Sequence, residues 1–379
     1  MRIKSKIYSL IITEECNLNC LYCYAQKGNR KKMNAKTAEL VYKYLKRDIL
    51  QNKIANAGII FSGNEPLLNF AILKKIFRNL SKDFKKNKEN HLSFGIFSNL
   101  CLMDRKTLKW LKNNGFYIHT SLDGSQDIHD FQRGKGSFKK TTFWIKEIIK
   151  EGIPLNVSAV ITRFSLDHWK EMIDTYLKLG LKSINFRALH PIGLGEKNWS
   201  KLSYSPEEFI EFRRKSLDYI LKINRSGYYF VEQKTLFLFN KIQKNIDSIF
   251  LMSPPCAAIT KQICIDPRGD IYTCDEGRSR KGIFKIGNIK KGINLIKAQT
   301  FFLLVHLATE KNCIKKKCKI NDLCGPCLAI NDSPLICNKF RCSIYKKEID
   351  YFINLSKKKS FRNLMNKWEK EQSIFLKWQ

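Results

Sequence analysis

The sequence predicts an α/β protein in which a parallel sheet with crossover helices is followed by a small cysteine-rich region. Strand-like and helix-like segments alternate six times in the first two hundred or so residues, which is the pattern of parallel β-α-β units. Nine of the thirteen cysteines stand between positions 256 and 342. Hydrophobic residues make up 44% of the 379 residues, so the chain can bury cores of this kind.

Each unit of the alternation joins a short apolar run to a segment whose apolar residues recur at helical spacing. The predicted strands are residues 6–13, 57–61, 91–97, 116–122, 155–161 and 183–189. The predicted helices are residues 35–51, 68–80, 104–114, 137–151 and 165–179. Ligands collect at the carboxyl ends of parallel strands. The polar loops that follow the strands are therefore candidate site loops: 13–24, 62–66, 98–99, 121–124 and 189–191.

The second half of the chain changes in character. The pattern stays helical over 205–244, and its start, Pro206-Glu207-Glu208, suits a helix N-terminus. From residue 253 turns multiply, beginning with Pro254-Pro255, and long periodicity is lost. This is expected of a small domain held by metal. Residues 344–379 return to a Lys-rich helical pattern.

The chain is strongly basic, with 69 Lys and Arg against 34 Asp and Glu and a formal net charge of +35. Such a balance suits an acidic peptide or nucleic-acid partner, but it also fits a solvated surface rich in lysine, which we favour. The start of the chain lacks a signal-peptide cleavage site, and its apolar runs are too short to span a bilayer. We therefore expect a cytoplasmic protein without a membrane partner, in which clustered cysteines bind metal.

The first three cysteines, Cys16, Cys20 and Cys23, have three and then two residues between them. Three thiolates can hold three irons of a [4Fe–4S] cube and leave the fourth iron open to an outside ligand. A structural zinc, the alternative, would normally need a fourth protein ligand close by. The loop follows the first predicted strand, so we interpret these cysteines as a chemical site.

This three-cysteine spacing, with Tyr22 before the third cysteine, resembles the hallmark of the radical S-adenosylmethionine (SAM) superfamily. Residues 61–68 resemble the family's Gly-Gly-Glu-Pro segment, which contacts the amino group of SAM. The resemblance therefore implies SAM contacts at Gly63, Asn64 and Glu65, with Asn64 in place of the second glycine.

Two further loops carry the resemblance. Ser98-Asn99 is similar to the family's Thr-Asn-Gly turn, with Leu100 in place of the glycine. Residues 121–133 resemble the peptide-modifying branch of the family. This implies that Ser121 and Arg133 contact the carboxylate or ribose of SAM and that the Leu189 backbone lies near adenine. A guanidinium suits a carboxylate physically.

The later cysteines resemble the SPASM extension of radical SAM maturases, which carries two auxiliary [4Fe–4S] clusters. A Cys-x12-Gly-x4-Cys block is followed by cysteines with gaps of four, five and two residues. Three clusters would use eleven cysteines, with Cys101 and one of Cys337 and Cys342 to spare. We favour Cys342 as a ligand. The resemblance implies a nearer cluster on Cys256, Cys264, Cys274 and Cys327, and an outer one on Cys313, Cys318, Cys324 and Cys342. Zinc is the competing metal, because Cys324-Gly325-Pro326-Cys327 is compatible with a zinc knuckle.

Asp275 directly follows one of these cysteines. In anaerobic sulfatase-maturating enzymes, the aspartate after the matching cysteine is the proposed base that deprotonates the substrate side chain. The resemblance therefore implies a catalytic Asp275, and the alternative is a solvated acidic turn. Residues 272–278 are also similar to maturases of peptides with His-Xaa-Ser repeats.

The resemblance covers residues 7–342 and implies a partial (β/α)6 TIM-like barrel with a C-terminal Cys-rich iron–sulfur (SPASM) domain. We expect the radical SAM barrel over 1–235, the SPASM-type region over 236–345 and a Lys-rich C-terminal helix over 346–379.

The implied activity is that of a maturase. It would cleave SAM to a 5′-deoxyadenosyl radical, with a flavodoxin- or ferredoxin-type electron donor, and would oxidatively modify a residue of a ribosomally made peptide by a crosslink or similar change. Formation of formylglycine in a sulfatase is the alternative. We expect no leader-binding domain before Cys16, which removes one common sign of a peptide maturase. The departures at Asn64 and Leu100 argue against a sulfatase-maturating enzyme, so we favour a peptide maturase. A non-catalytic relative and a zinc-containing nucleic-acid-binding protein are more distant alternatives, and we do not expect a nucleic-acid partner.

Overall fold

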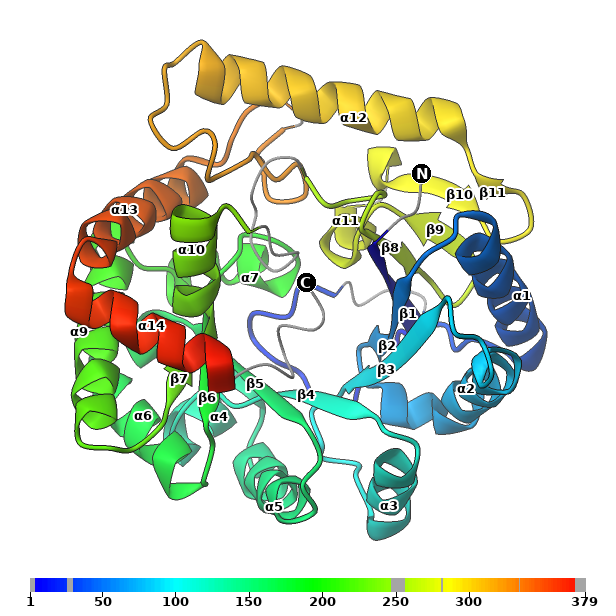
Figure 1. Cartoon of the computed structure of the whole chain (residues 1–379), viewed down its shortest axis with the longest axis horizontal. Coiled ribbons are helices and arrows are strands. Elements are labelled where there is room, and N and C mark those ends of the chain that lie inside the picture. Colours follow the sequence, from blue (N-terminus) through cyan, green and yellow to red (C-terminus); the bar gives the residue numbers. More distant parts are fainter. Residues whose placement is uncertain (1–3, 26–29, 247–255, 281, 334, 372–379) are drawn as a thin grey trace.

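An open, curved sheet forms the centre of the molecule (Figure 1). The computed structural model describes residues 4–25, 30–246, 256–280, 282–333 and 335–371. The first six strands are parallel and neighbour one another in chain order. They are β1 (Ser5–Thr13), β2 (Asn56–Gly63), β3 (His91–Phe97), β4 (Tyr117–Ser121), β5 (Leu155–Ile161) and β6 (Ser183–Ala188). The predicted parallel α/β alternation is confirmed, and the sheet stays open as a partial barrel requires.

Helices cover the outer face of this sheet (Figure 1). The crossover helices are α1 (Ala35–Gln51), α2 (Phe70–Phe84), α3 (Arg105–Asn113), α5 (Ser137–Lys150) and α6 (Trp169–Lys178). The predicted starts of α2 and α6 fall in 3-10 turns, η1 (Pro66–Asn69) and η2 (Arg163–His168). The short helix α4 (Gln126–Arg133) lies in the loop after β4 and was not predicted, because eight residues give little periodic signal.

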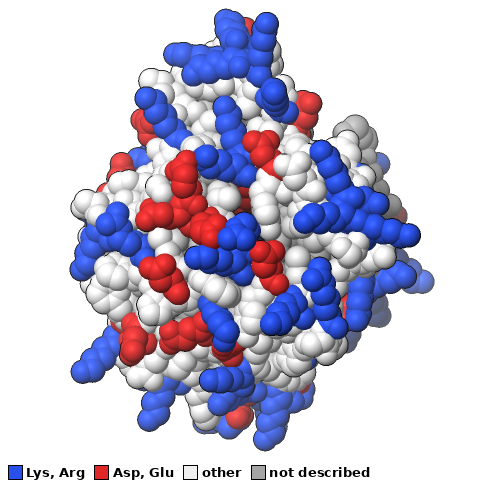
Figure 2. Space-filling model, turned by 90° about the vertical axis from the view of Figure 1, so that its left-hand side faces the viewer, with Lys and Arg blue, Asp and Glu red and all other residues white. Residues whose placement is uncertain are grey.

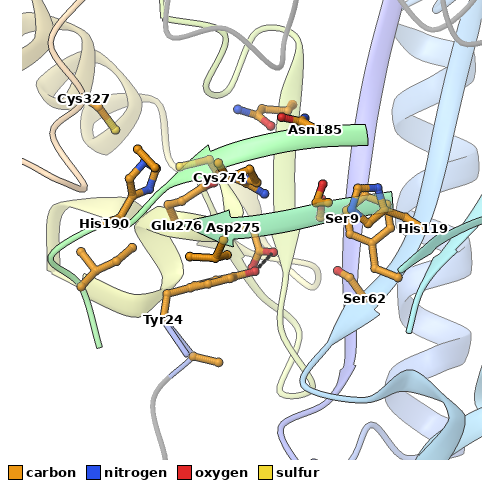
Figure 3. A pocket seen from close by; sticks show the side chains of 18 of the residues that line it. Ser9, Tyr24, Ser62, His119, Asn185, His190, Cys274, Asp275, Glu276 and Cys327 are labelled. Carbon is orange, nitrogen blue, oxygen red and sulfur yellow. Dashed lines mark hydrogen bonds and ion pairs between the residues drawn. The ribbon is translucent and has the colours of Figure 1, made fainter. Parts of the chain in front are cut away.

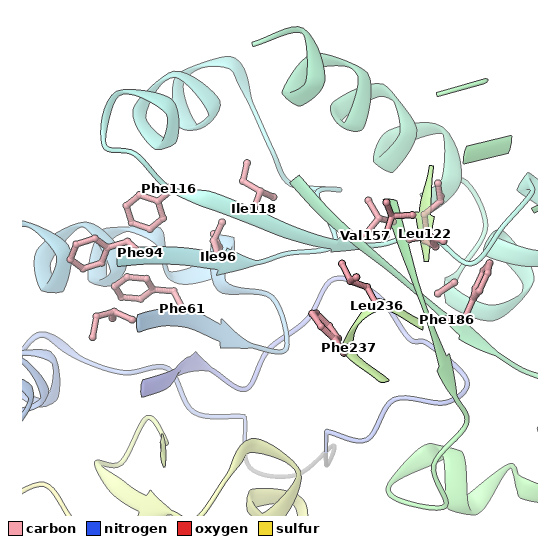
Figure 4. Packing of buried hydrophobic residues seen from close by; sticks show 14 of the residues in the cluster. Phe61, Phe94, Ile96, Phe116, Ile118, Leu122, Val157, Phe186, Leu236 and Phe237 are labelled. Atoms are coloured by element: carbon pink, nitrogen blue, oxygen red, sulfur yellow. The ribbon is translucent and has the colours of Figure 1, made fainter. Parts of the chain in front are cut away.

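Aromatic side chains fill the space between the sheet and the first helices (Figure 4). The Phe116 ring lies 5.2 Å from that of Phe77 and 5.8 Å from that of Phe94. The rings of Trp110 and Phe61 lie 5.4 and 6.1 Å from it. Burying a phenylalanine side chain contributes about 1.5–3 kcal/mol, so this cluster anchors the strands whose ends form the site.

The C-terminal half of the chain extends the same sheet. Strand β8 (Gln262–Ile265) pairs in parallel with β1, and β9 (Asp270–Tyr272), β10 (Lys285–Asn288) and β11 (Gly292–Ile293) continue antiparallel. Helix α11 (Asp275–Arg280) and η3 (Gly282–Phe284) lie inside this unit, and the fifteen-residue α12 (Leu295–Thr309) runs across it into a π-helical turn, η4 (Glu310–Ile314) (Figure 1). This region therefore has more regular structure than predicted. The predicted turn at Pro254-Pro255 lies outside the described residues.

Two predicted helices are each divided in the structure. The segment 205–244 forms α9 (Pro206–Arg225), β7 (Val231–Glu232) and α10 (Gln233–Lys244), so the predicted helical pattern is confirmed for most of it and is interrupted by a two-residue strand. Gly227, with φ +92°, turns the chain, and β7 pairs with β6. The C-terminal segment forms α13 (Lys339–Ser356) and α14 (Lys359–Glu371) instead of one helix, and residues 372–379 lie outside the described residues. The short helices α7 (Leu194–Lys197) and α8 (Trp199–Leu202) follow β6.

A buried group of charges joins the helices around β7. Arg213 of α9 forms ion pairs with Glu232 at 2.9 Å and with Glu348 of α13 at 3.2 Å. Lys234 of α10 forms a 2.5 Å ion pair with Glu348. Burial raises the pKa of Glu232, but the Arg213 charge and hydrogen bonds outweigh burial, so the pKa lies below its usual value. Because both carboxylates are buried, each depends on these cations.

Lysine and arginine side chains are spread over the visible face in Figure 2, with aspartate and glutamate among them. Exposed ion pairs include Arg214 with Glu211 and Lys347 with Glu207. This mixed arrangement is typical of a solvated surface. Within the described ranges, no helix has the length and apolar character needed to cross a bilayer.

We predict that Arg213→Met destabilises the protein by about 3–5 kcal/mol, because it leaves two buried carboxylates without their shared cation. The neighbouring Arg214 is the matched control, since its side chain is 48% exposed and its ion pairs lie in solvent. Arg214→Met should change stability by about 1 kcal/mol or less. Urea unfolding followed by circular dichroism measures the free energy of unfolding of both variants. An equal loss in the two would show that the buried ion pairs stabilise the protein no more than the exposed ones do.

Candidate active site

A cavity of about 980 Å³ lies within the curve of the sheet and at the carboxyl ends of its strands. Its wall includes the loop after β1, the ends of β2 to β6 and part of the cysteine-rich region. Small-molecule sites usually measure about 300–1,000 Å³. This cavity is at the upper end of that range, so it has room for a cosubstrate and part of a second molecule.

The first cysteine loop forms one side of the cavity. Cys16, Cys20 and Cys23 all line it. The Leu21 N–H donates to the Gln132 carbonyl at 2.9 Å, and the Leu194 N–H donates to the Cys23 carbonyl at 2.8 Å. Neighbouring elements therefore hold the loop through its backbone, so its thiols are available to bind a metal cluster.

Glycine is required where the chain passes this loop at Gly193. Its φ is +62°, and a Cβ there would lie 2.7 Å from the Cys23 carbonyl oxygen. Any side chain would displace the loop that carries the three cysteines.

The thiols of this loop suit a metal cluster. Burial raises the pKa of Cys16 and raises that of Cys20 to about 12. Such thiols become thiolates when a metal supplies compensating charge. The Leu18 N–H donates to the Cys16 sulfur at 3.3 Å and the Asn99 amide to the same sulfur at 3.8 Å. Three thiolates on one loop suit a [4Fe–4S] cube, which takes one thiolate on each of three irons.

A buried carboxylate, Asp123, ties this loop to the sheet. It accepts hydrogen bonds from the Tyr22 hydroxyl, from Arg133 Nε at 2.8 Å and from the Val160 N–H at 3.0 Å. The Arg133 guanidinium lies 5.4 Å from the centre of the Tyr22 ring. Burial raises the pKa of Asp123, but Arg133 outweighs burial and keeps the pKa below its usual value. Arg133 and Ser121 both line the cavity, although one nitrogen of Arg133 is already used by Asp123.

The loop after β2 approaches the cysteine loop through Gly63. Its φ is +124°, and a Cβ there would lie 2.4 Å from the Thr13 carbonyl oxygen, so only glycine fits. The Asn64 amide donates to the Glu14 carbonyl at 2.7 Å, while its buried Oδ1 has no hydrogen-bond partner among the described residues. Both Gly63 and Asn64 line the cavity.

The predicted SAM contact at Glu65 stays a prediction. Glu65 is fully buried outside the cavity lining. Its carboxylate accepts hydrogen bonds from the Ser98 hydroxyl and the Asn99 N–H, both at 2.8 Å. Burial raises its pKa to about 7. Glu65 therefore braces the loops after β2 and β3, and Leu100 of the second loop adopts a left-handed φ of +65° where the family turn has glycine.

Several polar atoms in the cavity are buried without a hydrogen-bond partner in the described part of the chain. They are Ser62 Oγ, Asn64 Oδ1, Thr120 Oγ1, Asn156 Oδ1 and Ser158 Oγ. Buried polar atoms normally have partners, and an unpaired one requires an explanation. A polar ligand such as SAM would supply those partners. Leu189 also lines the cavity, but its N–H already donates to the Tyr204 hydroxyl at 2.9 Å.

One end of the cavity carries Asp275 and residues of the second cysteine field, together with Tyr24 of the first cysteine loop (Figure 3). Asp275 accepts a 2.7 Å hydrogen bond from the Tyr24 hydroxyl, so the first cysteine loop contacts the predicted base directly. Burial, followed by the Asp275 charge, raises the pKa of Tyr24 well above its usual value. Sequence reasoning missed Tyr24, because its partner lies 251 positions away.

The ligand set predicted for the nearer auxiliary cluster stays a prediction, and Cys256 and Cys327 pack against the apolar cluster that contains Cys264. Cys256, Cys274 and Cys327 line the cavity. Cys264 lies in β8, is fully buried and is not part of the cavity wall. It belongs to an apolar cluster that includes Ile11.

Five cysteines, not four, gather beyond this end of the cavity. Burial and their mutual charges raise the pKa of Cys313, of Cys324 to about 11 and of Cys337 to about 11. Cys318 and Cys342 are among the groups whose charges act on them. The assignment of Cys342 over Cys337 as the late ligand stays a prediction. All thirteen cysteines are free thiols.

Several curated proteins are similar to this chain. An uncharacterized protein of Methanocaldococcus jannaschii is 27% identical over 296 residues, which are 77% of this chain and 92% of that protein. A cysteine-type anaerobic sulfatase-maturating enzyme of Clostridium perfringens is 25% identical over 358 residues, 89% of this chain and 93% of its own. The radical SAM cyclopropyl synthase TigE of Paramaledivibacter caminithermalis is 22% identical over 376 residues, which are 93% of this chain and 75% of that protein.

Two solved structures share the fold. Native anSMEcpe with bound AdoMet and Kp18Cys peptide superposes with a TM-score of 0.76 at 22% identity, over 93% of this chain and 99% of that one. Streptococcus suis SuiB bound to S-adenosylmethionine superposes with a TM-score of 0.65 at 18% identity, over 89% of this chain and 77% of that one. At these identities the likeness concerns the fold.

The family model of the radical SAM superfamily matches residues 10–199, half of the chain. The match includes the end of β1, the three-cysteine loop and β2 to β6, which together form most of the cavity wall. The chain belongs to the radical SAM superfamily, whose enzymes use a [4Fe–4S] cluster and SAM.

Proposed function

We propose that this protein is a radical SAM maturase that oxidatively modifies a residue of a ribosomally made peptide, by a crosslink or a similar change. The observation that carries the proposal is the shared cavity, because the three-cysteine loop and Asp275 both line it. A substrate side chain placed there would lie between the radical source and a base. The relatives named above, a sulfatase-maturating enzyme and a cyclopropyl synthase, support this class of activity.

The first cysteine loop would hold the SAM-binding cluster through Cys16, Cys20 and Cys23. When bound, the cluster and SAM supply a carbon radical that takes a hydrogen atom from the substrate. The protein's own part is to position and to shield. Asp123 fixes Tyr22 beside Arg133, and the unpaired polar atoms on β2, β4 and β5 offer hydrogen bonds to the polar groups of SAM.

Asp275 would act as the base that removes a proton from the substrate. Its carboxylate accepts the Tyr24 hydroxyl hydrogen bond and lies 3.5 Å from Arg278 Nε. These contacts fix its orientation at the cavity wall. A positioned carboxylate within reach of a substrate proton typically contributes about 10²–10⁴-fold to the rate.

Electrons must reach and leave the clusters. A flavodoxin- or ferredoxin-type donor and a cytoplasmic location stay predictions. The auxiliary thiols near the cavity would carry clusters that take up the electron released as product forms. The auxiliary thiols Cys256, Cys274 and Cys327, which line the cavity, support this assignment.

Formylglycine formation in a sulfatase is the second candidate, favoured by the likeness to the sulfatase-maturating enzyme over nearly the full length of both chains. The two candidates differ in product. Sulfatase maturation converts one Cys or Ser to an aldehyde, which reacts with hydrazide probes. A crosslinked peptide keeps no such aldehyde.

The proposal is tested by anaerobic reconstitution, followed by incubation with SAM and dithionite. We expect about twelve irons and as many acid-labile sulfides per chain, from three cubes, and formation of 5′-deoxyadenosine. Zinc in place of iron, without SAM cleavage, would overturn the proposal. Mass spectrometry and hydrazide labelling of peptides that stimulate the reaction then separate the two products.

We predict that Cys20→Ala abolishes reductive SAM cleavage, because the first cluster loses one of its three protein ligands. Cys101→Ala is the matched control, since Cys101 lies outside the cavity wall, near the Ser137 carbonyl and the Thr141 hydroxyl. It should retain iron content and turnover. Formation of 5′-deoxyadenosine is measured by chromatography, and undiminished cleavage by Cys20→Ala would refute the ligand assignment.

We predict that Asp275→Asn retains uncoupled SAM cleavage but lowers peptide modification by about 10²-fold or more, the usual contribution of a general base. Asp270→Asn serves as the control, because Asp270 pairs with Lys285 at 2.6 Å on β9, outside the cavity wall. Product and 5′-deoxyadenosine are quantified in the same reactions. Normal product formation by Asp275→Asn would remove this carboxylate from the mechanism.

A further inference from the structure

Helix α12 is apolar on nearly every side, although it lies at the surface of the molecule (Figure 1). Ten of its fifteen residues are apolar. A helix of this kind is normally buried all round. In α12, all of which the structure describes, three residues alone are buried: Ala298, Phe301 and Ala308. The Phe301 ring packs 5.8 Å from that of Phe284, so this side of the helix is fixed to the cysteine-rich region and the other sides face solvent or the cavity.

The exposed apolar side chains of α12 form two adjacent stripes. Residues that are seven and then eleven positions apart lie on one side of a helix. Ile296, Leu303 and Leu307 have this spacing, and Leu295 and Phe302 begin a second stripe one position earlier. Their exposed fractions run from 36% for Phe302 to 74% for Leu295 and Ile296. We call these five residues the apolar ridge.

The apolar ridge continues into the cavity of the candidate active site. Its member Phe302 also lines the cavity, together with Val305, His306 and Thr309 of the same helix. His306 is itself exposed, so α12 forms part of the rim. A molecule that extends from solvent past α12 into the cavity would therefore contact the ridge. Exposed apolar patches of this kind mark surfaces that bind a partner.

Lysine side chains stand beyond both ends of the ridge. Residues 290–319 contain eight lysines and a single acidic residue, Glu310. The eight lysines are all exposed: Lys290, Lys291, Lys297, Lys311, Lys315, Lys316, Lys317 and Lys319. Glu310 pairs with Lys315 at 3.3 Å, which leaves no carboxylate of this segment for the other seven. A partner with carboxylates on both sides of an apolar stretch would complement this surface.

We propose that the apolar ridge is a docking surface for the peptide substrate, which binds there through a segment with apolar side chains at its centre and acidic side chains at both ends. This inference rests on the proposed function, because it concerns recognition of that enzyme's substrate. The fifteen residues of α12 span about 22 Å. About seven residues of an extended peptide cover that length.

Docking at the ridge would place the reacting residue at the cavity without a separate encounter. A peptide held at the rim presents its remaining residues to the cavity at a raised local concentration. The enzyme would then select its substrate by a segment that the chemistry does not touch. The modified residue would need only to fit the cavity.

The test measures binding of a fluorescein-labelled peptide, Glu-Glu-Leu-Val-Phe-Ala-Leu-Glu-Glu, to the full reconstituted enzyme by fluorescence anisotropy. A second peptide, with lysine in place of every glutamate, is the charge control. We expect the acidic peptide to bind about tenfold more tightly or better, and we expect added salt to reduce this difference, because salt screens exposed charges. Equal affinities, or no binding of the acidic peptide at about 1 mM, would overturn the proposal.

Leu303→Asp tests the ridge itself, because it places a carboxylate among the apolar side chains. We expect it to weaken binding of the acidic peptide by about tenfold or more. Leu50→Asp is the matched control, since Leu50 is a 43% exposed helical leucine beside Lys43, Lys46 and Arg47 but outside the cavity wall. Circular dichroism checks folding, and Leu303→Ser replaces the aspartate variant if that one does not fold. An equal loss of affinity in ridge and control variants, or none in the ridge variant, would overturn the proposal.

Two other occupants of the ridge would give different results. A second copy of the chain would give a dimer in sedimentation velocity that Leu303→Asp dissociates. A membrane surface would give cosedimentation with phosphatidylglycerol vesicles that Leu303→Asp abolishes. Either result would overturn the assignment to a peptide, and a monomer that does not sediment with vesicles supports it.

The two proposals fail in distinguishable ways. Formation of 5′-deoxyadenosine depends on the first cluster and tests the proposed function. Its presence, together with peptide binding that Leu303→Asp does not weaken, would overturn the docking surface alone. Its absence in the unaltered enzyme would overturn the proposed function, whatever peptide binds to α12.

Discussion

The buried Asp123 carboxylate holds the candidate site together. It links the loop of the first three cysteines, through Tyr22, to Arg133 of α4 and to the backbone of β5 at Val160. A charge in this position is stable only while all of its donors are present. The geometry of the cysteine loop is therefore determined by the sheet below it. The sheet in turn depends on the aromatic packing that places its strands in register.

The parallel sheet could be predicted because each of its units is local. Strand and helix periodicity lie within a few tens of residues, and the predicted bounds of β3 and β5 are those observed. The three-cysteine loop could be predicted for the same reason, because its cysteines lie within eight residues of one another. The break between α9 and α10 was missed, because a two-residue strand such as β7 is determined by its partner and not by its own pattern.

The site was harder to predict where it depends on distant segments. Nothing near Tyr24 indicates a partner at Asp275, and nothing near Cys264 indicates that β8 would bury it against β1. Glu65 illustrates the same limit. Its motif was recognisable, but the hydrogen bonds that its carboxylate accepts from the loop after β3 could not be predicted from that motif.

The pairing of β8 with β1 also affects how the protein can be made. The edge of β1 that receives β8 is completed by residues about 250 positions later in the chain. Ribosomes add about 5–20 residues per second, so this edge waits on the order of 12 to 50 s for its partner. An unpaired, apolar strand edge invites association with other chains during that time. The first strand therefore stays open to such association until the cysteine-rich region has emerged.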